Sequence, residues 1–157
     1  MENNMVLEED TQRDRYLIFA LGRESYGLEI RCVKEIVGMQ PITELPEAPQ
    51  YVKGVINLRG KVIPVIDMRL KFGKEPSAYT DRTCIIVVEI GEESVGLIAD
   101  SVTEVLSIGD GSIVPPPSMS SGAEHVKSIG KVGSDVKLIL DCGKLMNSEF
   151  NTNQQEE

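Results

Sequence analysis

One cation in this sequence stands in an apolar setting where it could recognise a carboxylate. Residues 53–67 read KGVINLRGKVIPVID, in which two β-branched runs flank Arg59 and Gly60. This pattern predicts a β-hairpin with a tight turn at its tip. An Arg on a rigid hairpin can offer its planar guanidinium to a carboxylate or carbonyl of a partner. Arg59 is therefore either a recognition residue or an ordinary surface residue of the turn.

Residues that usually carry catalysis or bind metals are scattered. His125 is the only histidine, and no G-x-S-x-G elbow, phosphate-binding loop or G-x-G-x-x-G fingerprint accompanies it. Cys32, Cys84 and Cys142 lie far apart without a C-x-x-C pair, a pattern typical of small buried side chains rather than of a disulfide framework or zinc site. The sequence predicts no enzymatic activity, no cofactor and no metal.

The charge distribution limits the possible partners. The 157 residues carry a formal net charge of −9, concentrated in the acidic segments 1–14 and 148–157, and the pI is near 4.7. Nucleic-acid binding usually requires a basic face, so we expect no nucleic-acid partner. No apolar run approaches the roughly 20 residues of a membrane span, and the N-terminus lacks a signal-peptide pattern. We expect a cytoplasmic protein with no direct membrane insertion.

The elements that would position these residues are short. Strand candidates are rich in Val and Ile and bounded by Gly, Ser, Asp or Pro. They span residues 16–21, 25–30, 51–58, 61–67, 83–90, 94–100 and 136–141. Brief helices are expected at 31–37, 67–73, 101–106 and 142–147. The predicted fold class is mainly β, with short helices.

An internal repeat organises these elements. Residues 16–37 align with the segment 69 positions later, which pairs Gly27 with Gly96. With five more residues inserted, 52–67 aligns with 126–141, which pairs Asp67 with Asp141. The sequence therefore predicts a tandem duplication, with units at 15–79 and 80–147, an acidic N-terminal tail at 1–14 and a disordered tail at 148–157.

Each unit supplies four or five short antiparallel strands. A flat sheet of this size leaves two exposed edges, so a small SH3-like barrel is the economical solution. Two such barrels packed together bury more apolar surface than one, with residues 73–81 as the crossover. An exchange of a strand or helix between the units stays open, and the loop 109–125 is either a binding lid or a tolerated insertion.

Comparison of the two units separates fold positions from candidate functional ones. Asp67 and Asp141 each end a strand before a helical segment, which favours a helix-capping role. Arg59 aligns with Gly133, so the turn does not require an Arg in general. Glu35 recurs as Glu104, so part of its role is structural.

Four segments of the chain carry a family resemblance. They are, in order, YLIFALGRESYGLEI, VKEIV, ITELPEAPQYVKGVINLRGKVIPVIDMRLKFG and VGLIADSVTEVL. Their order and spacing resemble the CheW family of bacterial chemotaxis coupling proteins over about residues 15–147. The resemblance implies two tandem SH3-like five-stranded β-barrels packed together, with no catalytic activity.

The function implied by the resemblance is that of a chemotaxis adaptor. Such a scaffold couples chemoreceptors, the methyl-accepting chemotaxis proteins, to the histidine kinase CheA and transmits receptor control of kinase activity. It would be recruited from the cytoplasm to membrane-associated chemoreceptor arrays. The alternative is a CheW-like module of another two-component signalling pathway.

The resemblance also suggests two sets of contact residues. The receptor-binding or coupling set, facing the cytoplasmic tip of chemoreceptors, is Val33, Glu35, Gly54, Asn57, Arg59 and Gly60. The kinase-binding set, facing the CheW-like regulatory domain of CheA, is Met39, Pro41, Ile42 and Leu45. The second set is predicted because an exposed apolar strand of the first barrel could pack on a partner barrel.

The two units differ in charge. Residues 15–79 carry ten bases and seven acids, whereas 80–147 carry five bases and ten acids. This difference leads to the hypothesis that head-to-tail packing with CheW-like neighbours is electrostatically favoured.

Overall fold

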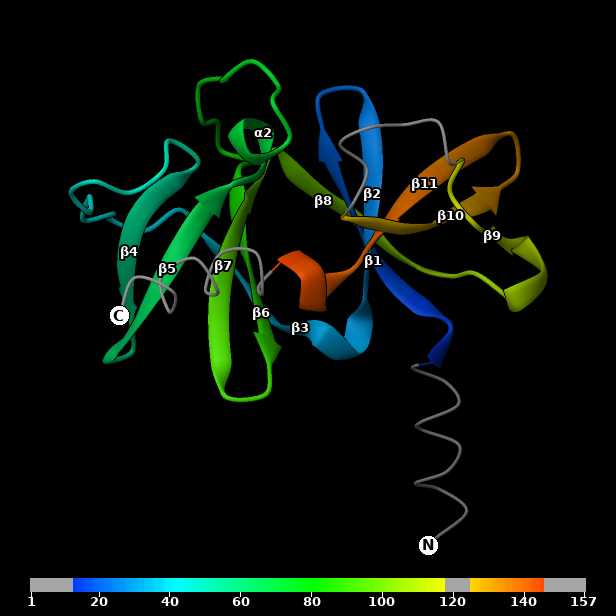
Figure 1. Ribbon diagram of the computed structural model, residues 1–157, viewed down its shortest axis with the longest axis horizontal. Coiled ribbons are helices and arrows are strands. Elements are labelled where there is room, and N and C mark those ends of the chain that lie inside the picture. Colours follow the sequence, from blue (N-terminus) through cyan, green and yellow to red (C-terminus); the bar gives the residue numbers. More distant parts are fainter. Residues whose placement is uncertain (1–12, 118–124, 146–157) are drawn as a thin grey trace, which may run out of the picture.

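In the computed structural model, which describes residues 13–117 and 125–145, the chain folds into two β-sheets (Figure 1). The first repeat contains β1 (Arg15–Leu21), β2 (Glu24–Glu29), β3 (Val33–Gly38), β4 (Val52–Leu58) and β5 (Lys61–Asp67). The second contains β6 (Cys84–Ile90), β7 (Glu93–Ala99), β8 (Ser101–Ser107), β9 (Ile113–Val114), β10 (Val126–Val132) and β11 (Asp135–Leu140). Short helical segments are η1 (Ile30–Cys32), α2 (Met68–Lys71), η2 (Asp110–Ser112) and a turn at 142–145. The predicted mainly β class is confirmed.

The two repeats exchange their first hairpins. The six-stranded sheet has the order β8-β1-β2-β11-β10-β9, and the five-stranded sheet has the order β3-β6-β7-β5-β4. The hairpin β1–β2 of the first repeat therefore lies among strands of the second, and β6–β7 lies among strands of the first (Figure 1). The exchange that the sequence left open is present, and it is reciprocal.

The sheets consequently do not follow the expected units at 15–79 and 80–147. Strands between residues 33 and 99 build the five-stranded sheet, and the remaining strands build the other. The second sheet has six strands rather than five because Ile113–Val114, within the loop 109–125, pairs with β10. Residues 118–124 of that loop, residues 1–12 of the expected N-terminal tail and the whole expected tail at 148–157 lie outside the described residues.

Two of the four expected helices are strands instead. Only Arg31 and Cys32 are helical, as part of η1, whereas 33–37 lie in β3 and 101–106 lie in β8. Along β3, half-buried and exposed residues alternate. This period of two is that of a strand with one covered face, and it overrides the helical spacing of Val33, Ile36 and Val37. The expected helices at 67–73 and 142–147 are present as α2 and the turn at 142–145.

The repeated glycines lie where the exchanged hairpins join their new sheets. Gly27 on β2 pairs in parallel with Ile139, and Gly96 on β7 pairs in parallel with Val65. A Cβ on Gly27 would come within 2.8 Å of Ile139 Cδ1. A Cβ on Gly96 would come within 2.8 Å of Val65 Cγ1 and 2.7 Å of Ile85 Cγ2. These glycines therefore allow the close junctions that the exchange requires.

The apolar core has three parts, and the largest connects the sheets. One cluster draws its buried residues from the five-stranded sheet and includes Ile56 and Val87. Another belongs to the six-stranded sheet and includes Ile18 and Ile139. The third, which we call the shared core, consists of Leu17, Phe19, Leu21, Tyr26, Leu28, Ile66, Met68, Ile86, Val88, Val95, Leu97, Ala99, Leu140, Cys142 and Leu145. Because it takes residues from both sheets, it fixes them against each other.

The recurring aspartates cap the helical segments that follow their strands. Asp67 is buried, and its Oδ1 accepts hydrogen bonds from Arg69 N at 3.0 Å and Leu70 N at 3.4 Å. Asp141 Oδ1 accepts a hydrogen bond from Lys144 N at 3.0 Å. The predicted capping role is therefore confirmed in both repeats.

A bidentate ion pair ties the first hairpin to the other sheet. Arg69 Nε and Nη2 donate to the two oxygens of Asp100 at 2.8 and 2.6 Å. Gly22 N, in the β1–β2 turn, donates to the same carboxylate at 2.7 Å. The hydrogen bonds from Arg69 are the largest influence on the pKa of Asp100 and hold it below its usual value. The pair thus joins α2, the β7–β8 link and the exchanged hairpin.

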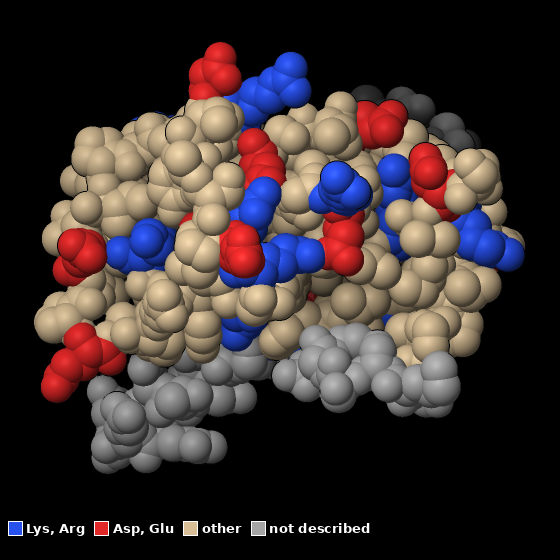
Figure 2. All heavy atoms as spheres, turned by 90° about the horizontal axis from the view of Figure 1, so that it is seen from above, with Lys and Arg blue, Asp and Glu red and all other residues tan. Residues whose placement is uncertain are grey.

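The charge difference between the sequence repeats does not carry over to the sheets. Residues 33–99, which supply the five-stranded sheet, hold nine acids and eight bases. Residues 15–32 and 100–147 together hold eight acids and seven bases. Figure 2 also shows acidic and basic side chains interleaved over one face. The hypothesis of charge-favoured head-to-tail packing loses its basis, because the hairpin exchange evens out the charge.

The glycine junction gives a test of the exchanged fold. We expect Gly96→Ala to lower the free energy of unfolding by about 1–3 kcal/mol, because the added methyl group overpacks the contact with Val65 and Ile85. Gly38→Ala is the control, since a Cβ there meets nothing within 4 Å. Urea unfolding measures both variants. Equal stability of the two variants would contradict the close β5–β7 junction.

Candidate functional site

The turn between β4 and β5 holds Arg59 in a left-handed backbone conformation. Arg59 has a φ of 53° and Gly60 a φ of 87°. Two successive positive values are typical of the two-residue turn that matches the twist of a hairpin. Asn57 Oδ1 accepts a hydrogen bond from Gly60 N at 2.8 Å. The predicted hairpin is confirmed, and Asn57 and Gly60 shape the turn that presents Arg59.

Arg59 forms an ion pair with Glu35, another residue of the receptor set. Its Nη2 donates to Glu35 Oε2, which joins the β4–β5 turn to β3. The Arg59 side chain remains 66% exposed, whereas that of Glu35 is 25% exposed. Exposed pairs contribute only about 0–1 kcal/mol to stability. The carboxylate therefore orients the guanidinium while leaving much of it accessible to a partner.

Further paired charges extend along the same sheet. Lys34 Nζ donates to Glu89 Oε2 at 3.3 Å, and Lys61 Nζ donates to Ser94 Oγ at 3.1 Å. The Ser94 hydroxyl in turn donates to Glu89 Oε2 at 3.2 Å. The hydrogen bond from Lys34 is the largest of the influences that lower the pKa of Glu89. We call Lys34, Glu35, Arg59, Lys61, Glu89 and Ser94 together the paired strip.

Two other residues of the receptor set lie within the fold. Val33 is half-buried and packs against the shared core. Gly54 is buried with a φ of 143°, and a Cβ there would lie 2.1 Å from Thr43 O. Thr43 exchanges two backbone hydrogen bonds with Val55, so Gly54 permits the bridge between this segment and β4. Val33 and Gly54 therefore support the packing of the fold, whereas Glu35 and Arg59 reach the surface.

The kinase set divides into packed and exposed residues. Met39 and Ile42 are half-buried and pack against the core of the five-stranded sheet. Pro41 is exposed, and Leu45 is 44% exposed. This segment contains an isolated bridge at Thr43 rather than the expected continuous strand. Of the four residues, Pro41 and Leu45 are the ones available to a partner.

Residue-by-residue analysis of the sequence missed a set of exposed apolar side chains. Ile36 and Val105 are 43% and 40% exposed and occupy equivalent positions of the two repeats. Val62 and Val136, 64% and 56% exposed, form a second equivalent pair. The repeat alignment contained this signal, because it places an apolar residue on the outer face of both copies.

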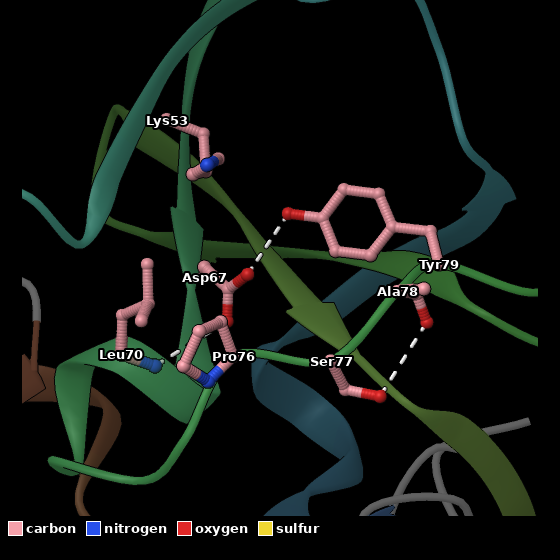
Figure 3. Close-up of a pocket in the computed structure, with 7 residues that line it drawn as sticks. All are labelled: Lys53, Asp67, Leu70, Pro76, Ser77, Ala78 and Tyr79. Carbon is pink, nitrogen blue, oxygen red and sulfur yellow. Dashed lines mark hydrogen bonds between the residues drawn. The ribbon is translucent and has the colours of Figure 1, made fainter.

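A small pocket lies beside the capping aspartate (Figure 3). It has a volume of about 220 Å³ and is lined by Lys53, Asp67, Leu70, Pro76, Ser77, Ala78 and Tyr79. Tyr79 donates its hydroxyl to Asp67 Oδ2 at 2.8 Å, and burial, together with this bond, raises the pKa of Tyr79. Both carboxylate oxygens of Asp67 therefore accept hydrogen bonds from groups of the fold itself, so Asp67 has a structural role in this pocket.

Comparisons with known proteins identify the family. A profile described as a CheW-like domain matches residues 15–150. The chain is 37% identical over 142 residues to a chemotaxis protein CheW of Klebsiella aerogenes. The aligned residues cover 89% of this chain and 86% of that protein. The chain belongs to the CheW-like family. A probable chemotaxis protein CheW of Rhizobium etli is 40% identical over 129 residues, covering 82% and 83%.

A solved structure supports the same assignment. The crystal structure of the scaffolding protein TtCheW from Thermoanaerobacter tengcongensis is similar with a TM-score of 0.78 and 40% identity, covering 82% of this chain and 88% of that one. The predicted resemblance to CheW and its fold class are confirmed. The relatives are named as chemotaxis and scaffolding proteins, which supports an adaptor role.

Over residues 13–117 and 125–145, no helix combines the length and apolar character needed to cross a bilayer. Over the same ranges, His, Cys, Asp and Glu side chains form no group of three that could hold a metal ion.

The conformation of the turn gives a variant that separates the ion pair from the fold. Arg59→Asn removes the charge, and Asn followed by Gly60 is the sequence that this turn prefers. We expect the free energy of unfolding to stay within about 1 kcal/mol of the parent protein, because an exposed ion pair contributes little. Urea unfolding is the measurement.

The matched variant in the same turn is Asn57→Ala. It removes the hydrogen bond to Gly60 N, and we expect it to cost about 1 kcal/mol. If Arg59→Asn lowered the free energy of unfolding by more than roughly 2 kcal/mol, the loss would be of the size seen when a core or a buried hydrogen-bond network is damaged. Arg59 would then be needed for the stability of the fold.

Proposed function

We propose that this chain couples chemoreceptors to the histidine kinase CheA and transmits receptor control of kinase activity. Membership of the CheW-like family supports this function at the level of a scaffold. The observation that carries the finer proposal is the Glu35–Arg59 pair. Two residues suggested by the resemblance, far apart in sequence, form one oriented and accessible group on the five-stranded sheet.

The receptor contact is proposed to use the paired strip. A guanidinium held by one carboxylate still has donors free for a second acceptor, and its geometry suits a carboxylate or backbone carbonyl on a receptor helix. Ile36, exposed on β3, shares the outer face of the strand with Lys34 of the paired strip and adds apolar surface there. A polar anchor beside an apolar surface fits the surface of an amphipathic helix.

The kinase contact is proposed to lie on the segment after β3. Pro41 and Leu45 are exposed there, while Met39 and Ile42 fix the segment to the core beneath. A rigid segment with outward apolar side chains loses little conformational entropy when a partner barrel packs on it. The receptor and kinase faces would then lie on one sheet, within a single packed unit.

Transmission through such a scaffold requires no covalent chemistry. The receptor shifts an equilibrium between active and inactive arrangements of the kinase. The scaffold changes that equilibrium only if its contacts differ in free energy between the two arrangements. The shared core makes the chain a stiff connector, because movement of one sheet against the other would open buried apolar contacts.

Reconstitution tests the proposal directly. Receptor cytoplasmic fragments, CheA and this chain are combined, and kinase autophosphorylation is measured with and without the chain. We expect receptor-dependent stimulation by the parent protein. Arg59→Asp and Glu35→Gln should reduce the stimulation at least about fivefold, which corresponds to the lower end of typical coupling free energies between two sites. The thermal unfolding of Arg59→Asp should stay nearly unchanged.

The second repeat supplies the matched control. Glu104 occupies the position equivalent to Glu35 but is exposed on β8, so Glu104→Gln should retain stimulation. If the parent protein gave no receptor-dependent stimulation of the kinase, the coupling role would be contradicted. Equal loss in Glu35→Gln and Glu104→Gln would contradict the assignment to the paired strip while leaving the coupling role in place.

A further inference from the structure

One lysine that lines the pocket of Figure 3 has no internal partner. Lys53 lies half-buried on β4 and borders the pocket of about 220 Å³ beside Asp67 (Figure 3). Over residues 13–117 and 125–145, the Lys53 ammonium makes no hydrogen bond and no ion pair. Taking an ammonium partly out of water costs free energy unless an acceptor replaces the lost water. A half-buried lysine without an acceptor therefore marks a place where an external anion is favoured.

The second repeat shows what the equivalent lysine does. Lys53 aligns with Lys127, and Lys127 Nζ donates a hydrogen bond to Glu29 Oε1. The side chain of Glu29 is only 17% exposed, so this ion pair is partly removed from water. The lysine at this position of the repeat therefore binds a carboxylate where the chain supplies one.

The first repeat lacks that carboxylate because of a single aligned position. The parallel junctions of the two sheets have the same register, since Gly27 and Gly96 face aligned residues of β11 and β5. Glu29 and Ile98 each lie two residues after these glycines. Ile98 is 3% exposed and packs in the core of the five-stranded sheet. An apolar side chain thus occupies the position of Glu29, and Lys53 is left without an internal carboxylate.

The other walls of the pocket favour an anion with a single charge. Leu70, Pro76 and Ala78 supply apolar surface that suits a short aliphatic stem. Ser77 Oγ donates to Ala78 O at 3.5 Å, longer than a usual O–H···O bond, so this hydroxyl can turn to a ligand. Asp67 carries a negative charge at the same pocket, which disfavours a dianion such as phosphate.

We propose that this pocket binds a carboxylate on a short aliphatic stem, with the Lys53 ammonium as its anchor. The volume is below the roughly 300–1,000 Å³ of pockets that hold drug-sized ligands, so one small group fills it. Two sources carry this chemistry, which are a glutamate side chain of a protein partner and a free small carboxylic acid. Binding of a free acid does not depend on the chemotaxis role, whereas contact with a receptor or kinase rests on the proposed function.

Titration of the full chain with butyrate tests the pocket. Backbone amide shifts in the NMR spectrum are followed, and we expect saturable changes confined to the pocket residues. Lys53→Gln should weaken the binding about tenfold or more, because a hydrogen bond between charged groups is lost. Butyramide has the same stem without the charge, so it should bind far more weakly than butyrate. Inorganic phosphate should also bind far more weakly.

Lys127→Gln is the matched control. It removes the equivalent ammonium, and Glu29 keeps its ion pair with Arg31 at 2.9 Å, so butyrate should bind as it does to the parent protein. Urea unfolding checks that both variants remain folded. The proposal is overturned if Lys53→Gln binds butyrate as tightly as the parent protein. It is equally overturned if butyramide binds as tightly as butyrate, because the pocket would then select apolar groups only.

Cross-linking distinguishes the two sources. Receptor cytoplasmic fragments, CheA and this chain are combined with a water-soluble carbodiimide, which joins a paired ammonium and carboxylate as an amide with loss of water. A cross-link from Lys53 to an acidic residue of the receptor or CheA assigns the protein source. Butyrate binding without that cross-link assigns the free acid, and absence of both overturns the proposal. Butyrate binding without any kinase stimulation by the parent protein would contradict the proposed function alone.

Discussion

The shared core holds the molecule together, because neither repeat covers its own first hairpin. Phe19 and Leu28 on β1 and β2 pack in one cluster with Ile66 and Leu97 from the other sheet. The exchange of hairpins makes this cluster continuous, since each sheet is completed by strands of the opposite repeat. A break in either sheet would therefore expose apolar surface in both. The two barrels form one cooperative unit rather than two domains joined by a linker.

The paired strip depends on that exchange. Lys34 on β3 and Lys61 on β5 come from the first repeat, whereas Glu89 on β6 and Ser94 on β7 come from the second. These residues are neighbours only because β6–β7 is inserted between β3 and β5. The first repeat, even if folded alone, would contain the Glu35–Arg59 pair and both lysines but would lack Glu89 and Ser94, with which the lysines pair. The complete paired strip is thus a property of the duplicated fold.

The sequence could predict what each repeat determines locally, and it could not predict what depends on long-range pairing. The aspartate caps and the Arg59 turn follow from short patterns that act over a few residues. The hairpin exchange does not, because exchanged and unexchanged pairings bury the same alternating residues. The segment VKEIV was predicted as a helix because Val33, Ile36 and Val37 share helical spacing, whereas pairing with β6 decided its structure. The Glu35–Arg59 pair was hidden for the same reason.

The backbone at Arg59 argues that stability alone does not account for this residue. A left-handed conformation costs a non-glycine residue roughly 1–2 kcal/mol, and Arg59 adopts it with a φ of 53°. The equivalent turn of the second repeat has Gly133 at a φ of 61°, where that cost is absent. The exposed ion pair with Glu35 offsets about 0–1 kcal/mol at most. A glycine or asparagine would serve the turn better, so the guanidinium is best explained by what it offers at the surface of the five-stranded sheet.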